Sequence, residues 1–181
     1  MEGEGNERKC VLSFSSEEPY TRFWGVEILD HDEQAVDLSR LNDIGCVLFN
    51  HNRDAVVGKI VRAWIENRRG CAEVEFDTDE KSEVIFQKVR SGTLKGVSVG
   101  YRIDTFEEVA PGKTSTDGRF TGPCEIARKW WPFEISIVSV PADPTVGVGR
   151  EAETLPETPP LEVFEAQLQI NKNTIGGNAN G

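Results

Sequence analysis

Serine and histidine side chains that could together carry out acyl transfer are the most informative residues of this sequence. Ser98 lies between glycines in the run Gly96-Val97-Ser98-Val99-Gly100, and the 181 residues include two histidines, His31 and His51. Both histidines precede the serine. A serine hydroxyl is a weak nucleophile until an adjacent base accepts its proton. If Ser98 is a nucleophile, its base therefore comes from earlier in the chain.

The five residues around Ser98 match the G-x-S-x-G pattern of the α/β-hydrolase nucleophile elbow, but the sequence that follows does not. The elbow requires a strand, a sharp turn and a helix, with the histidine after the serine. Here the chain continues Val-Gly-Tyr-Arg-Ile-Asp-Thr-Phe, which predicts a strand over 96–107. On that strand Ser98 shares a face with Gly96 and Gly100, which leave its hydroxyl accessible. The alternative to a nucleophile is that Ser98 is simply a small residue, tolerated where another part of the chain packs against the sheet.

The two histidines have different surroundings. His51 follows an apolar strand predicted over 46–49 and lies in the turn-forming triplet 50–52, at the rim of a sheet. His31 is flanked by acidic residues in what we expect to be an exposed turn over 30–33. Acidic neighbours raise the proton affinity of an imidazole, which makes His31 the poorer general base. We therefore expect His51 to be the base, the alternative being a solvated rim histidine. The residues around His31 give a weak indication of a divalent-ion site, and we predict no metal.

A carboxylate interrupts a late apolar strand. Glu134 shares a face with Ser136, whereas Phe133, Ile135 and Ile137 form the opposite row, which we expect to face the core. Carboxylates are seldom fully buried without a partner. An imidazole partner would satisfy Glu134, and the carboxylate would fix the tautomer of that ring. The alternative is a solvated glutamate on an edge strand.

The remaining pattern predicts an α+β protein that is mainly β. Strands are predicted over 20–29, 46–49, 56–66, 71–77, 96–107, 124–131 and 133–140, the last two separated by Pro132. Residues 67–70 form the turn of a hairpin, 36–43 a short helix or irregular loop, and 109–123 a mobile loop or the tip of a long hairpin.

One helix is clearly predicted, over residues 80–90. Thr78 or Asp79 can cap its first turn, and Ser91-Gly92 can end it. Val84, Ile85, Lys88 and Val89 form a stripe at helical spacing.

Composition limits the possible functions. A net charge of −11 argues against nucleic-acid binding, and no apolar run is long enough to span a membrane. The N-terminus lacks the features of a signal peptide. The four cysteines are widely spaced, so we expect reduced thiols in a cytoplasmic protein and no zinc site. We divide the chain into a flexible N-terminus (1–10), one folded domain (11–150) and a mostly disordered acidic tail rich in Pro and Gly (151–181).

Three blocks of sequence, taken together, resemble the tailed-phage prohead protease family. These are serine peptidases of capsid maturation, similar in fold to the herpesvirus protease assemblin. The blocks are Leu48–Asn52, Val89–Tyr101 and Phe133–Ala142, and the resemblance extends from about Phe23 to Val148. The resemblance implies that Ser98 is the nucleophile, His51 the general base and Glu134 the residue that orients the imidazole. It also implies a small closed β-barrel with helices on its outside, and no cofactor.

The resemblance further implies a substrate and a setting. The substrate would be a scaffolding protein or capsid delta segment, other prohead proteins such as the major capsid and portal proteins, and the protease itself. The reaction would take place inside the assembling prohead in the host cytoplasm, and a homodimer is one expected form. From the strand pattern rather than the resemblance, the candidates to hold the oxyanion are backbone amides near the strand of Ser98 and Arg102, which lies farther along the face of Ser98. The alternative is a non-catalytic assembly or scaffold-binding module that keeps the barrel.

Overall fold

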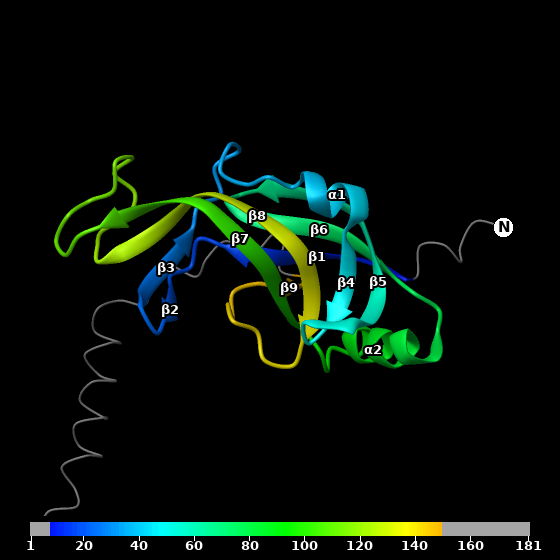
Figure 1. Cartoon of the computed structure of the whole chain (residues 1–181). Coiled ribbons are helices and arrows are strands. Elements are labelled where there is room, and N and C mark those ends of the chain that lie inside the picture. The colour runs from blue at the N-terminus through cyan, green and yellow to red at the C-terminus, as the bar shows by residue number, and fades with distance from the viewer. Residues whose placement is uncertain (1–7, 150–181) are drawn as a thin grey trace, which may run out of the picture.

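The computed structural model describes residues 8–149, in which nine strands form one mixed sheet and two short helices lie beside it (Figure 1). The strands are β1 Lys9–Ser16, β2 Tyr20–Arg22, β3 Gly25–Leu29, β4 Cys46–Phe49, β5 Asn52–Glu66, β6 Arg69–Phe76, β7 Gly96–Val109, β8 Cys124–Val138 and β9 Gly147–Val148. The helices are α1 Ser39–Ile44 and α2 Glu80–Arg90. The predicted tail over 151–181 lies outside the described residues, as does the predicted flexible N-terminus apart from residues 8–10. No helix in the described range is long and apolar enough to cross a membrane.

Strand β8 is the centre of the sheet. It pairs antiparallel with β7 along its whole length, from Gly96 opposite Val138 to Val109 opposite Cys124. Its other edge pairs in parallel with β3 and then with β4. We predicted two strands broken at Pro132, and this was wrong. The strand continues through Pro132, which lies opposite Tyr101 where the register of the ladder shifts, so the missing N–H falls at an irregular position.

The predicted hairpin and helix are confirmed. Strands β5 and β6 are joined through Asn67 and Arg68, which both have positive φ (50° and 57°), as a two-residue hairpin turn requires. In α2, the Asp79 side chain accepts from two backbone amides of the first turn. The buried face differs from the expected stripe. It consists of Ser82, Ile85, Phe86 and Val89, whereas Val84 is half exposed.

The mainly β, α+β class is confirmed, but the closed barrel is not. The strand order is β2-β3-β8-β4-β5-β6-β1-β9, with β7 on the outer edge of β8. Within the described residues no ladder joins β7 to β1 or β9. The amide of Val148 donates to the carbonyl of Lys95 (3.1 Å), but β9 has two residues and pairs with β1 alone, so the sheet stays open there.

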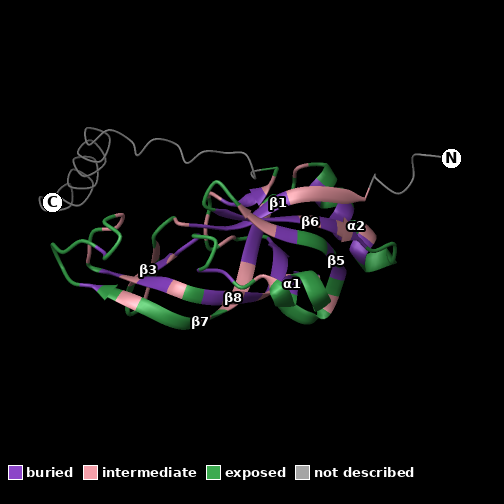
Figure 2. Cartoon of the chain, turned by 90° about the horizontal axis from the view of Figure 1, so that it is seen from above, coloured by how far each residue is buried: buried purple, intermediate pink, exposed green. Residues whose placement is uncertain are grey.

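The core lies between the two halves of the curved sheet. Figure 2 shows buried residues concentrated in β1, β6 and β8, whereas the helices are exposed on their outer sides. Trp130, Ile135 and Ile137 of β8 are at most 1% exposed. Because β8 is an interior strand that packs on the core, the polar side chains at its carboxyl-terminal end have fixed positions.

Candidate active site

Ser98 lies on β7, opposite Ser136 of β8, with 9% of its surface exposed. It lines a cavity of about 220 Å³. No hydrogen-bond partner of its hydroxyl is found among residues 8–149. The flanking glycines lie close to other groups: a Cβ on Gly96 would lie 2.6 Å from the carbonyl oxygen of Val138. Ser98 is therefore a nearly buried residue in the wall of a cavity, on a strand held closely against β8.

His51 lies in the tight turn between β4 and β5, as predicted, and lines the same cavity as Ser98. Asn50 and His51 both have positive φ (51° and 58°), a conformation for which Asn and His are among the more tolerant residues. Three hydrogen bonds hold this turn against β8 and the residue that follows it. The Asn50 amide donates to Ile137 O (2.9 Å), the Ser139 amide donates to Asn50 Oδ1 (3.1 Å), and the His51 amide donates to Ser136 Oγ (3.1 Å).

Glu134 contacts His51 directly. Its Oε1 lies 2.6 Å from His51 Nδ1, and its Oε2 accepts from the hydroxyl of Ser136 (2.7 Å). An ionised carboxylate accepts only, so Nδ1 carries the proton and Nε2 is left as the acceptor of the neutral ring. Glu134 is 7% exposed on an interior strand, which excludes the alternative of a solvated edge glutamate. The structure thus brings His51 and Glu134 together as the sequence predicted.

Ser98 and His51 line the same cavity but are not hydrogen-bonded to each other. No hydrogen bond joins Ser98 Oγ to His51 within the described range. Catalytic hydrogen bonds are often long in a substrate-free enzyme and shorten when substrate binds. The arrangement supplies a carboxylate-bound imidazole and a serine hydroxyl in one concave site, which are the groups that acyl transfer from a peptide requires.

His31 is not in the exposed turn that we predicted. It is 2% exposed, its Nδ1 lies 2.8 Å from the carbonyl oxygen of Leu29, and its Nε2 lies 2.7 Å from Ser15 Oγ. A carbonyl only accepts, so Nδ1 carries the proton and Ser15 donates to Nε2. Burial lowers the pKa of His31 to about 4, although the carbonyl of Leu29 and the neighbouring acidic groups raise it. Desolvation outweighs the nearby negative charge, contrary to our expectation.

Ser15 and His31 therefore form a second serine–histidine pair, and Ser15 lines the same cavity as Ser98. This pair has a backbone carbonyl on Nδ1 where His51 has a carboxylate. A carbonyl fixes the tautomer but stabilises a developing imidazolium less than a full negative charge does. His51 is therefore the better candidate for a general base than His31, because its Nδ1 contacts a carboxylate whereas Nδ1 of His31 contacts a backbone carbonyl.

Three residues of the cavity wall were not predicted from the sequence. The guanidinium of Arg22 donates to Tyr101 Oη (2.5 Å) and lies 3.1 Å from Glu27 Oε1, and Tyr101 also donates to Glu27. Burial, together with the bond to Glu27, raises the pKa of Tyr101. No spacing marks these residues, because they come from β2, β3 and β7. Arg102, the speculative oxyanion donor, does not line this cavity; its guanidinium lies 5.7 Å from the ring centre of Trp131.

Ser136 was placed correctly on the face of Glu134, but no role was predicted for it. It connects the Glu134 carboxylate to the His51 amide. The period-two pattern of β8 was the signal that could have identified it.

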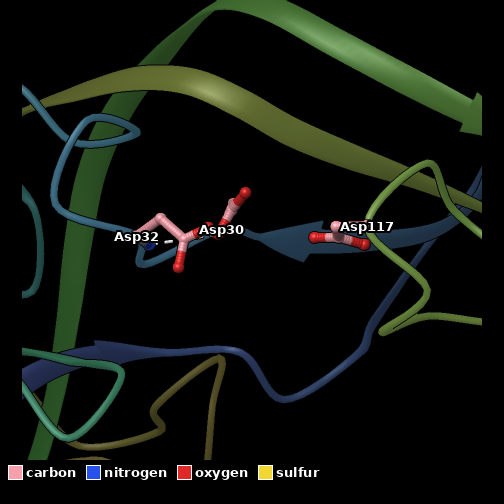
Figure 3. Close-up of side chains that lie close together, drawn as sticks. All are labelled: Asp30, Asp32 and Asp117. Atoms are coloured by element: carbon pink, nitrogen blue, oxygen red, sulfur yellow. Dashed lines mark hydrogen bonds between the residues drawn. The ribbon is translucent and has the colours of Figure 1, made fainter.

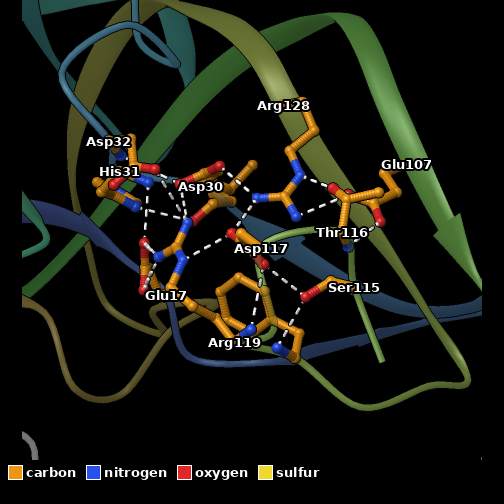
Figure 4. Close-up of polar contacts among 12 residues, drawn as sticks. Glu17, Asp30, His31, Asp32, Glu107, Ser115, Thr116, Asp117, Arg119 and Arg128 are labelled. Carbon is orange, nitrogen blue, oxygen red and sulfur yellow. Dashed lines mark hydrogen bonds and ion pairs between the residues drawn. The ribbon is translucent and has the colours of Figure 1, made fainter. Parts of the chain in front are cut away.

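Three carboxylates elsewhere, of Asp30, Asp32 and Asp117, lie close enough together to bind a cation (Figure 3). Arg119 forms an ion pair with each of them (Figure 4). Arg119 and Arg128 contact Asp30 at 2.6 and 2.7 Å and Asp117 at 2.7 and 2.8 Å. Burial raises the pKa of Asp30, but the two arginines outweigh it and hold that pKa below its usual value. The cluster is an ion-pair network.

Comparison with known proteins identifies the family to which this chain is similar. The sequence model of the caudovirus prohead serine protease family matches residues 32–159. The chain is also 36% identical over 169 residues to a protein named major capsid protein from Halomonas phage phiHAP-1. That alignment covers 90% of this chain and 27% of the phage protein, so the chain spans about a quarter of that relative's length. No solved structure matches.

Proposed function

Because the chain belongs to the caudovirus prohead serine protease family, we propose that it is a serine endopeptidase that cleaves prohead proteins, and itself, during phage capsid maturation. The observation that supports this most directly is the bond between His51 Nδ1 and Glu134 beside a cavity that Ser98 also lines. A carboxylate–imidazole pair next to a serine is the arrangement that activates a hydroxyl for attack on a carbonyl carbon.

In the proposed reaction, His51 Nε2 accepts the proton of Ser98 Oγ as that oxygen attacks the scissile carbonyl. The imidazolium then donates this proton to the leaving amine, and an acyl-enzyme forms. Water, deprotonated by His51, hydrolyses the ester and restores Ser98. Glu134 keeps the proton on Nδ1 and stabilises the imidazolium. We assign the oxyanion to backbone amides, since Arg102 lies at another site.

The proposed substrates are a scaffolding protein or capsid delta segment and other prohead proteins, with cleavage inside the prohead in the host cytoplasm. The phage relative supports a capsid polypeptide as a substrate. This chain aligns with part of a longer protein that is named a major capsid protein. The portal protein and a second copy of the chain are further proposed partners.

Labelling with a serine-directed fluorophosphonate tests the nucleophile. We expect one labelled serine, Ser98, with the label lost in Ser98→Ala and His51→Ala. Ser15→Ala is the matched control, because Ser15 also contacts a histidine and lines the same cavity. Label retained in Ser98→Ala and lost in Ser15→Ala would assign the chemistry to the other pair.

A non-catalytic assembly module is the second candidate function. It is favoured by the name of the phage relative and by the absence, in the described residues, of a hydrogen bond between Ser98 and His51. Mass spectrometry of co-expressed capsid components distinguishes the two. Defined cleavage products that disappear in Ser98→Ala support the protease, and intact components in assembled proheads support the module.

A further inference from the structure

A second hollow, of about 460 Å³, adjoins Glu134 and shares no lining residue with the cavity of Ser98. Three arginines from different elements surround it: Arg40 of α1, Arg53 of β5 and Arg102 of β7. Trp131 and Phe133 of β8 supply a partly buried aromatic surface. The hollow therefore combines positive charge with apolar area.

These three arginines are exposed, and none of them has a carboxylate within ion-pair distance in residues 8–149. Most other arginines of that range are in ion pairs, namely Arg8, Arg22, Arg62, Arg68, Arg119 and Arg128. The one acidic group in the wall, Glu134, already binds His51 and Ser136. In a chain of net charge −11, the hollow thus collects cations that have no carboxylate partner among residues 8–149. A lining of this kind attracts an anionic ligand.

The chain itself contains a segment of matching chemistry. Residues 151–165 include five glutamates and no lysine or arginine, and the first basic residue after Arg150 is Lys172. Leu155, Leu161, Val163 and Phe164 lie among those glutamates. Fifteen extended residues reach about 50 Å, so the distal part of this segment, around Phe164, can lie well away from the position of Gly149.

We propose that the hollow lined by Arg40, Arg53 and Arg102 binds the acidic segment 151–165 of the same chain. The glutamates pair with the guanidinium groups, and Phe164 or a neighbouring aliphatic side chain packs on Trp131 and Phe133. Binding would hold the chain that continues from Gly149 against the strand that carries Glu134.

Photo-crosslinking in the full-length Ser98→Ala chain tests this binding independently of proteolysis. A benzophenone amino acid replaces Phe164, and crosslinked peptides are identified by mass spectrometry. We expect crosslinks to residues of the hollow, lost at least tenfold in the variant Arg40→Glu/Arg53→Glu/Arg102→Glu. The matched control is Lys81→Glu/Arg90→Glu/Lys113→Glu, which makes the same change of net charge at exposed cations elsewhere and should keep the crosslinks.

Three results would overturn the proposal. Crosslinks that map outside the hollow, or that fall equally in both triple variants, would show that general electrostatic attraction alone acts on the segment. Crosslinks between isotopically light and heavy chains in a mixture would show that a second copy supplies the segment. Because every sample carries Ser98→Ala, a failure here does not affect the proposed protease activity, which the labelling experiment tests separately.

Discussion

At the scale of single residues, the carboxylate of Glu134 has two oxygens and each has its own donor, His51 Nδ1 and Ser136 Oγ. Ser136 in turn accepts from the His51 amide, so the backbone and the ring of His51 are both tied to β8. Gly100 leaves the space for this arrangement. A Cβ there would lie 2.5 Å from Glu134 Oε1 and 2.6 Å from the ring of Phe133.

We predict that Gly100→Ala lowers the rate of peptide cleavage at least tenfold, because the added methyl displaces the Glu134 carboxylate from His51. Glu134→Gln, which keeps the shape and removes the charge, should lower it on the order of 100-fold or more. The double variant should be no slower than Glu134→Gln, since both changes break one interaction. Initial rates of cleavage by the native chain, the two single variants and the double variant measure these effects, and urea unfolding of the same four proteins checks that each is folded. Multiplicative effects on rate would mean that Gly100 acts elsewhere.

At the scale of elements, the β7–β8 hairpin is long and its tip folds back onto β3. Residues 109–123 were predicted as a mobile loop or a hairpin tip, and the structure places them at the tip. Arg119 from the tip contacts Glu17 (2.8 Å) and Asp30 (2.6 Å), as Figure 4 shows. Arg128 of β8 lies 2.7 Å from Asp30, and its Nη2 lies 2.6 Å from Glu107 Oε2 without the alignment of a hydrogen bond. Asp30 and Asp117 are thus the two anions that contact both arginines, and Asp30 is the more deeply buried of the two.

We predict that Arg119→Ala and Arg128→Ala each lower the free energy of unfolding by about 1 kcal/mol. Together they should lower it by more than the sum, because Asp30 is 3% exposed and would lose both of its cations. Adding Asp30→Asn to the double variant should recover part of the loss. Urea denaturation at constant salt measures these differences. Strict additivity, with no recovery by Asp30→Asn, would contradict the shared role of Asp30.

At the scale of the whole molecule, one sheet carries both the candidate active site and a buried, uncharged imidazole. His31, two residues after the end of β3, packs on Trp130 of β8 with ring centres 5.4 Å apart. Its pKa is about 4 in the folded protein, against about 6.5 for an exposed histidine in the unfolded chain. Between these values the unfolded chain binds the additional proton, so the stability contributed by His31 is present at pH 7 and is lost as the pH falls toward 4.

We predict that the native chain loses about 2 kcal/mol of unfolding free energy between pH 7 and pH 5 through His31 alone. In His31→Gln the free energy of unfolding at pH 7 should be lower than in the native chain, since a buried hydrogen-bonded ring is replaced. The decrease in unfolding free energy of this variant between pH 7 and pH 5 should be about 2 kcal/mol smaller than that of the native chain. Urea denaturation curves at both pH values for both proteins provide the comparison. An equal decrease in the two proteins would mean that His31 titrates alike in the folded and unfolded states.

The local elements followed from sequence because their signals are local. Alternation predicted β7, paired apolar strands around residues 67–70 predicted the hairpin, and Asp79 with Gly92 marked the ends of α2. The pairing of His51 with Glu134 was also predictable, since a rim imidazole and a carboxylate on a buried strand each needed a partner. The choice of Ser98 over other serines depended on its glycine neighbours and on the family resemblance.

What the tertiary structure alone decided is where polar groups are buried and what lies beside them. Four neighbouring acidic or polar residues made 30–33 resemble an exposed turn, yet His31 and Asp30 are buried because Ser15, Arg119 and Arg128 reach them from distant parts of the chain. The hollow with Arg40, Arg53 and Arg102 likewise has no sequence signature. Burial and long-range pairing are properties of the packed sheet, and a period of two residues carries no information about which strand lies opposite.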